Sequence, residues 1–120
     1  MHHAGAAADP ALHAAYQACA FTVYPSFTEG FGLPVLESLQ HGKPCVCSAR
    51  GALGESARGG GCVALESVDA ASLAGAIRRL LRDPAELAAL AAAARARTFR
   101  SWTDQARELT AWMSTLPRRA

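Results

Sequence analysis

Hydrophobic residues follow two kinds of pattern along the chain, short apolar runs in the first half and helical repeats in the second. Apolar runs bounded by Gly, Pro or Ser predict buried strands near residues 21–24, 44–48 and 61–65. Apolar residues three or four positions apart predict helices near residues 33–41, 70–81, 84–97 and 102–113. Strands that alternate with helices are typical of an α/β fold with a parallel sheet, here followed by a helical segment.

Local signals sharpen the helical part of this prediction. Asp83 reads as an N-cap before Pro84, and Ser101 with Asp104 repeats the pattern before the last helix. A further helix, capped by Asp9, is expected to carry Leu12, Tyr16 and Cys19 on one face. The Ala-rich run 85–96 is expected to be helical because alanine has the highest helix propensity. The expected core stripe of helix 70–81 comprises Leu73, Ile77, Leu80 and Leu81.

The segment 29–37 combines two acids with a glycine-bearing turn between a strand and a helix. Pro34 is tolerated only in the first turn of a helix, so the residues before it lie at the helix N-terminus. Unpaired N–H groups and the helix dipole favour an anion there, and Gly30 and Gly32 allow close approach of the backbone. Glu29 and Glu37 can therefore border one ligand such as a diphosphate. Taken alone, the pattern is equally compatible with Glu29 as a solvated loop acid and Glu37 as a carboxylate that only interacts favourably with the helix dipole.

Residues 25–39, PSFTEGFGLPVLESL, contain an E-x7-E spacing that resembles the retaining GT-B glycosyltransferases of group 1, the family 4 type. Further landmarks of that family follow in order over nearly the whole chain: HGKPCVCS at 41–48, a degenerate G-G-x-x-E turn at 51–55, a helix ending in D-P at 69–84, and FRSW at 99–102. The resemblance implies a partial Rossmann-like parallel sheet with C-terminal helices, which is the second half of the C-terminal, donor-binding domain of a GT-B fold.

The resemblance also implies roles for these residues. Glu29 would be the catalytic acid that meets the donor sugar, Glu37 would bind ribose hydroxyls, and Gly30, Phe31, Gly32 and Leu33 would complete the donor-binding site. The enzyme would transfer a hexose from a nucleotide sugar to a glycan or lipid-linked acceptor with retention, and without a metal or other cofactor. The sequence of the motif is most similar to bacterial polysaccharide transferases, among which mannosyltransferases are common. GDP-mannose is therefore the first donor that we expect.

The resemblance divides the 120 residues into a flexible start (1–8), an α/β half with the E-x7-E motif (9–68) and a helical tail (69–120). It also implies that an acceptor domain and the basic pair that clamps the donor diphosphate are missing from this chain. Lys43 and Arg50 are candidates to replace this basic pair only because they carry a positive charge. Because these parts are missing, the isolated chain is expected to be inactive. The strand at 21–24 would also lack one neighbour, so the chain is expected to self-associate through that edge.

Charge and cysteine content mainly exclude functions. A net charge of +2 is too small to indicate nucleic acid, although arginines gather in the helical tail. They are expected to solvate helix faces, with an Arg-rich membrane or nucleic-acid binding module, or a split chain that needs a partner half, as alternatives. We expect a cytoplasmic protein, with peripheral contact to the inner membrane as the alternative. The cysteines are expected to be buried and reduced, with Cys45 and Cys47 on opposite faces of one strand, and Trp102 and Trp112 to be packing anchors.

Overall fold

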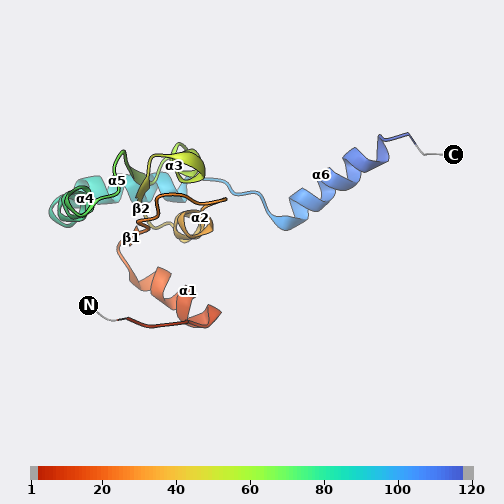
Figure 1. The fold of residues 1–120 in the computed structure, drawn as a ribbon. Coiled ribbons are helices and arrows are strands. Elements are labelled where there is room, and N and C mark those ends of the chain that lie inside the picture. The colour runs from red at the N-terminus through yellow and green to blue at the C-terminus, as the bar shows by residue number, and fades with distance from the viewer. Residues whose placement is uncertain (1–2, 118–120) are drawn as a thin grey trace.

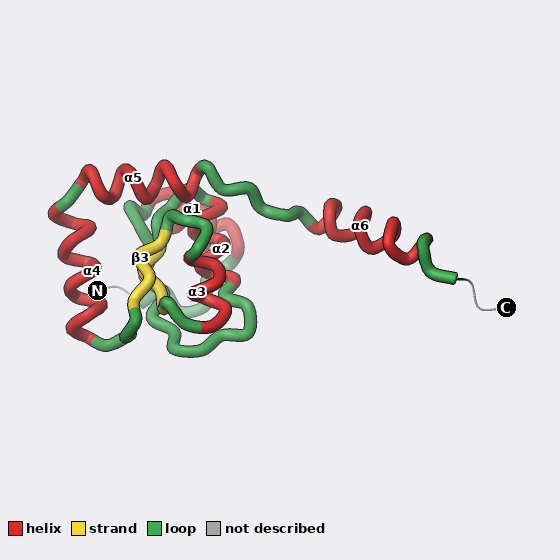
Figure 2. Tube along the Cα trace, turned by 90° about the horizontal axis from the view of Figure 1, so that it is seen from above, coloured by secondary structure: helices red, strands yellow, loops and turns green. Residues whose placement is uncertain are grey.

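A computed structural model describes residues 3–117 and shows an α/β body from which the last helix projects (Figure 1). The overall extents of 64 × 32 × 28 Å reflect that projection (Figure 2). Residues 3–8 carry no regular structure, and residues 1 and 2 of the expected flexible start lie outside the described part. The elements are α1 (Asp9–Ala18), β1 (Thr22–Val23), α2 (Leu33–Gln40), β2 (Cys45–Ser48), α3 (Gly51–Ala57), β3 (Cys62–Leu65), α4 (Ala70–Arg82), α5 (Pro84–Arg95) and α6 (Trp102–Ser114).

The three strands form one parallel sheet in the order β1-β2-β3. Thr22 lies beside Cys45, and Cys45 lies beside Cys62. Helices α2 and α3 make the crossovers between successive strands, as parallel pairing requires. The predicted partial Rossmann-like α/β architecture is therefore confirmed. Among residues 3–117, β1 pairs only with β2 and so forms one edge of the sheet.

Two apolar clusters cover the two faces of the sheet. Cys45 and Cys47 pack on one face with side chains of α2 and α3, while Val46 packs on the other face with α4. The prediction that Cys45 and Cys47 lie on opposite faces is wrong, because residues two positions apart in a strand point to the same side. The neighbouring Cys47 thiol and, next to it, burial raise the pKa of Cys45, so this thiol stays neutral and acts as a small apolar side chain.

The sequence prediction missed α3, whose residues were expected to form only a turn. Glycines at positions 51 and 54 lower the helix propensity of this segment. Gly54 is nevertheless required, because a Cβ there would overlap the Ala49 carbonyl oxygen. Leu53 is 1% exposed and lies in the same cluster as Cys45, so burial of this side chain stabilises a helix that propensity alone does not predict.

The predicted cap of α5 is confirmed, whereas two finer predictions fail. The Asp83 side chain accepts the Glu86 N–H at 2.9 Å, as expected of an N-cap. Asp9 is not a cap: the N-cap of α1 is Ala8, no side chain caps that helix, and Asp9 lies in its first turn. Leu80 is 1% exposed but Leu81 is 67% exposed, because successive helical residues differ by about 100° in direction.

Arg97 joins the end of α5 to the end of α3. Its guanidinium donates hydrogen bonds to the Ser56 carbonyl at 2.7 Å and to the Gly60 carbonyl at 3.4 Å, and it lies 5.3 Å from the Phe99 ring centroid. These carbonyls lie in the last turn of α3 and just after it, where a cation is favoured. Arg97 therefore differs from the solvated arginines that we expected throughout the helical tail.

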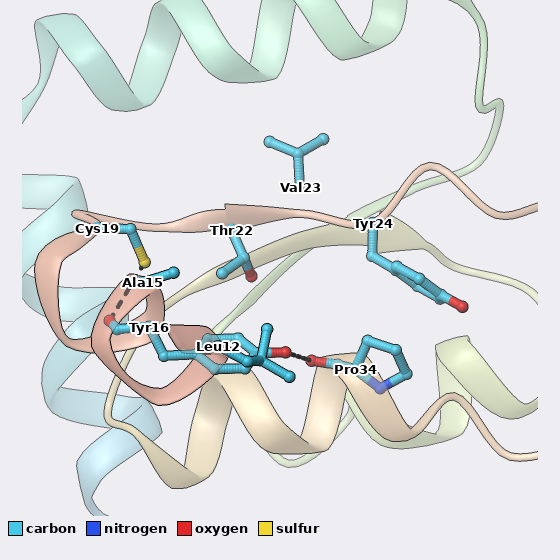
Figure 3. A pocket seen from close by; sticks show the side chains of 8 residues that line it. All are labelled: Leu12, Ala15, Tyr16, Cys19, Thr22, Val23, Tyr24 and Pro34. Atoms are coloured by element: carbon cyan, nitrogen blue, oxygen red, sulfur yellow. Dashed lines mark hydrogen bonds between the residues drawn. The ribbon is translucent and has the colours of Figure 1, made fainter. Parts of the chain in front are cut away.

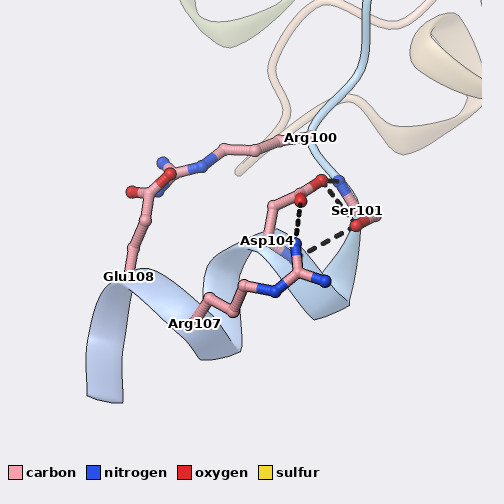
Figure 4. Close-up of polar contacts among 5 residues, drawn as sticks. All are labelled: Arg100, Ser101, Asp104, Arg107 and Glu108. Atoms are coloured by element: carbon pink, nitrogen blue, oxygen red, sulfur yellow. Dashed lines mark hydrogen bonds and ion pairs between the residues drawn. The ribbon is translucent and has the colours of Figure 1, made fainter. Parts of the chain in front are cut away.

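Helix α6 extends away from the body and has no buried residue (Figure 1). Ser101 and Asp104 form the predicted capping box, and Arg100 pairs with Glu108 while Arg107 lies 3.5 Å from Asp104 (Figure 4). Trp102 and Trp112 are 89% and 58% exposed, so within residues 3–117 they anchor no packing. Arg118 and Arg119 lie outside the described residues. None of the helices in residues 3–117 combines the length and apolarity needed to cross a membrane.

Candidate functional site

The turn between β1 and α2 is built around Gly32, which is the N-cap of α2 in the left-handed conformation with φ of 76°. A Cβ at this position would lie 2.6 Å from Leu53 Cδ2, so both backbone and packing require glycine. Pro34 occupies the first turn of α2, as predicted. Gly30 has open space around it instead, since a Cβ added there would meet no heavy atom within 4 Å. The glycine turn thus leads directly into a helix N-terminus.

Glu29 precedes this turn and is held by two hydroxyl groups. Tyr24 Oη donates to Glu29 Oε1 at 2.6 Å, and Ser26 Oγ donates to the same oxygen at 3.0 Å. The Tyr24 hydrogen bond, helped by the Ser26 bond, lowers the pKa of Glu29 below its usual value. Glu29 is therefore an ionised acceptor at neutral pH, with its second oxygen available for a ligand hydroxyl.

A cleft of about 480 Å³ lies beside Glu29 at the carboxyl ends of the strands. Ser48 at the end of β2, and Glu66 and Ser67 just after β3, line it together with Arg50. The region outside the carboxyl ends of parallel strands is where open α/β sheets bind ligands. The cleft therefore surrounds Glu29 with hydroxyl, carboxylate and guanidinium groups, which suits a polyol with an anionic part.

Glu37 lies one turn inside α2 and faces α1. Tyr16 Oη donates to Glu37 Oε2 at 3.1 Å. Burial, with a smaller contribution from Glu37, raises the pKa of Tyr16 to about 12, so the hydroxyl stays protonated. Glu37 does not line the cleft beside Glu29, so the two acids take different positions relative to the glycine turn. Gly30 to Leu33 lie between the two acids along the chain, and Phe31 and Leu33 are 64% and 57% exposed.

The sequence analysis missed the partners of both acids. Tyr24 ends the first predicted strand and Tyr16 lies on the predicted face of the first helix, but neither position indicates a contact with a carboxylate. Two basic residues were named above as candidates to replace the missing basic pair. Arg50 lines the cleft, whereas Lys43 Nζ donates to the Gln17 carbonyl at 3.0 Å. Within residues 3–117, no three His, Cys, Asp or Glu side chains gather as metal ligands.

A second hollow of about 300 Å³ lies at the open edge of β1 (Figure 3). Leu12 and Tyr16 of α1 and Cys19 just after it form one wall, and Thr22, Val23 and Tyr24 form the other. Its lining is mainly apolar, and Val23 is 37% exposed. This hollow lies on the side of β1 where a further strand of the sheet would pair.

Comparison with known proteins agrees with this architecture. Residues 1–97 match the family model of the glycosyl transferases group 1. The chain therefore belongs to the group 1 glycosyltransferases.

The names of individual relatives refer to different substrates. The chain is 38% identical to the O-antigen chain mannosyltransferase B of Escherichia coli over 87% of its own length, and 42% identical to a D-inositol 3-phosphate glycosyltransferase 1 of Catenulispora acidiphila over 71%. It is 45% identical to a glycogen synthase of Mycobacterium tuberculosis over 62%. These matches span only 27%, 21% and 18% of the three relatives. No solved structure matches the chain significantly.

Proposed function

We propose that this chain supplies the E-x7-E part of the donor-binding site of a retaining GT-B glycosyltransferase. The complete enzyme transfers a hexose from a nucleoside diphosphate to a glycan or lipid-linked acceptor. The observation that carries the proposal is the pair Glu29 and Glu37 on either side of a helix N-cap whose left-handed backbone and close contact with Leu53 favour glycine. Membership of the group 1 family supports the same reaction class.

Each residue has a physical task in this proposal. Glu29, ionised and already oriented by Tyr24, accepts hydrogen bonds from hydroxyls of the donor sugar in the adjoining cleft. Glu37 accepts hydrogen bonds from the two hydroxyl groups of the ribose. The amides at the start of α2 face the diphosphate, because a helix N-terminus stabilises negative charge. Charge neutralisation by amides and basic side chains requires no metal ion.

Retention is proposed to follow from displacement on one face of the sugar. The leaving diphosphate takes the proton of the acceptor hydroxyl as that oxygen bonds to the anomeric carbon and the bond to the diphosphate breaks. Glu29 holds the sugar during this exchange and forms no bond to it. GDP-mannose is the first donor to test, since a mannosyltransferase is among the relatives. A cytoplasmic site of action, with peripheral membrane contact for a lipid-linked acceptor, belongs to the same proposal.

Because the chain spans 27% of the E. coli relative, transfer is best assayed in a hybrid enzyme. The chain replaces the matching segment of that mannosyltransferase, and transfer from GDP-mannose is measured together with GDP binding by calorimetry. Glu37→Ala should weaken GDP binding by about 1.5–3 kcal/mol, whereas Glu29→Ala should mainly lower turnover.

The matched control is Glu55→Ala, which removes an exposed acid of α3 outside the cleft. Glu55→Ala should leave both GDP binding and turnover at the level of the unmodified hybrid. GDP binding that is unchanged in Glu37→Ala would contradict the ribose assignment.

Two alternatives can be tested with the same proteins. A chain that works only with a partner half would show no transfer alone but transfer after mixing with the missing portion. A membrane-binding tail would bind vesicles of anionic lipid, and Arg95→Ala with Arg100→Ala would abolish that binding. Arg97 is left in place in this test because it stabilises the junction of α3 and α5.

A further inference from the structure

A cluster of aromatic side chains joins α1 to α2 beside Glu37. The Tyr16 ring stacks on the His41 ring with a centroid separation of 4.7 Å and an interplanar angle of 18°. His41 Nδ1 lies 2.8 Å from the Glu37 carbonyl oxygen, which can only accept, so His41 carries its proton on Nδ1. His13 Nδ1 lies 2.6 Å from His41 Nε2 on the other side of that ring. The Tyr16 ring is therefore held against a histidine that α2 itself fixes.

The Tyr16 hydroxyl has two possible acceptors and favours the carboxylate. Glu37 Oε2 lies at 3.1 Å. The Pro34 carbonyl oxygen, drawn with Tyr16 in Figure 3, lies at 3.5 Å. Hydroxyl hydrogen bonds normally span about 2.5–3.0 Å, and a charged acceptor makes the stronger bond. One oxygen of Glu37 is thus engaged, and the other is free for a ligand.

We infer that Tyr16 is a positioning residue for Glu37 in nucleotide binding. The inference rests on the proposed function of Glu37. A glutamate on a helix surface samples several rotamers, and binding a ribose would fix one of them at a cost in entropy. A protonated hydroxyl on a ring that stacking already fixes restricts Glu37 before the nucleotide arrives.

This role makes α1 part of the donor-binding site, although α1 buries no residue of its own. Polar contacts hold α1 in place: Tyr16 to Glu37, His13 to His41, and Lys43 Nζ to the Gln17 carbonyl at 3.0 Å. Only the Tyr16 contact reaches a carboxylate of the E-x7-E pair. The positioning effect can therefore be separated from mere attachment of α1.

The test measures GDP binding to the 120-residue chain by NMR titration at millimolar ligand, with thermal unfolding of each variant as the check on folding. Tyr16→Phe keeps the ring that stacks on His41 and removes only the hydroxyl. We expect the dissociation constant for GDP to rise roughly three- to tenfold. Tyr16→Phe should have no further effect in a Glu37→Ala background, which removes the acceptor of the Tyr16 hydroxyl. His13→Ala is the matched control: it removes a polar contact of α1 that does not reach the carboxylate and keeps both the Tyr16 hydroxyl and its ring, so its effect on GDP binding should be smaller than that of Tyr16→Phe.

The outcomes separate this inference from the proposed function. If Glu37→Ala weakens GDP binding while Tyr16→Phe does not, Tyr16 only attaches α1 and the positioning role is wrong, whereas the nucleotide role of Glu37 stands. An equal effect of Tyr16→Phe with and without Glu37→Ala, or an effect of His13→Ala as large as that of Tyr16→Phe, also overturns the positioning role. If the chain binds no GDP, or Glu37→Ala binds it normally, the assignment of Glu37 and the inference fail together.

Discussion

Helices α2 and α6 are stabilised in opposite ways. Helix α2 has no side-chain cap, begins at a left-handed glycine and buries Val35, Ser38 and Leu39 against the sheet. Helix α6 has a complete capping box and surface ion pairs but buries nothing (Figure 4). The helix that carries Glu37 is therefore fixed by the rest of the fold, whereas the terminal helix depends on interactions within its own sequence. A helix with few local signals can still be the one that positions the site.

The largest expected effect comes from the core beneath α2. Leu39 is 1% exposed and packs among Cys45, Leu53 and Ala94, so Leu39→Ala should leave a cavity and destabilise the fold by about 2–5 kcal/mol. Urea unfolding followed by circular dichroism measures this change. Leu109→Ala in α6, where the leucine is 48% exposed, should change stability by less than about 0.5 kcal/mol. Similar losses in both variants would show that α6 packs against something in solution.

The next effect concerns the start of α2. Gly32→Ala combines an unfavourable left-handed conformation with a contact of 2.6 Å to Leu53, so we expect a loss of about 1–3 kcal/mol in urea unfolding. Gly30→Ala is the control in the same turn, because its added methyl group meets no atom within 4 Å. Equal stability of the two variants would mean that the turn relaxes and that Gly32 is not required by the fold.

The sequence predicts features held by local interactions, as in α6, better than features held by tertiary packing, as in α2. The Ser101–Asp104 box and the Asp83 cap depend on residues three positions apart, and both were predicted and are present. The three strands were predicted because each is a short apolar run. Helix α3 and the hydroxyl partners of Glu29 and Glu37 were missed. Burial of Leu53 and the contact of Tyr16 with Glu37, 21 residues away, depend on tertiary packing that no local pattern encodes.

A smaller effect is expected at the cap of α6. The Ser101 hydroxyl accepts the Asp104 N–H at 3.1 Å, so Ser101→Ala should destabilise this helix locally by about 0.5–2 kcal/mol. Faster hydrogen exchange of the α6 amides would report it, while the urea midpoint of the body stays unchanged because α6 buries nothing. Ser114→Ala, at the other end of α6, removes no N-cap and serves as the control. A lower urea midpoint in Ser101→Ala would contradict the independence of α6 from the body.

The smallest expected effect is a change in proton binding beside the glycine turn. Tyr24 donates to Glu29 at 2.6 Å and is the main cause of the lowered pKa, so Tyr24→Phe should raise the pKa of Glu29 toward its usual value. Carboxyl carbon chemical shifts in an NMR titration measure this change. Asp104 in α6 is the internal reference, since Ser101 lowers its pKa and Tyr24→Phe does not touch it.

The sign of the pH dependence follows from the direction of that shift. Because the folded-state pKa of Glu29 lies below the unfolded value of about 4.3, its ionised form stabilises the fold above that pH and the contribution is lost as pH falls through the folded pKa. Tyr24→Phe should therefore be less stable than the parent chain at neutral pH, and this difference in stability should shrink in acid. An unchanged Glu29 titration would show that Ser26 alone holds the carboxylate. Tyr24 would then not be the residue that orients Glu29 toward the donor sugar, as the proposed function requires.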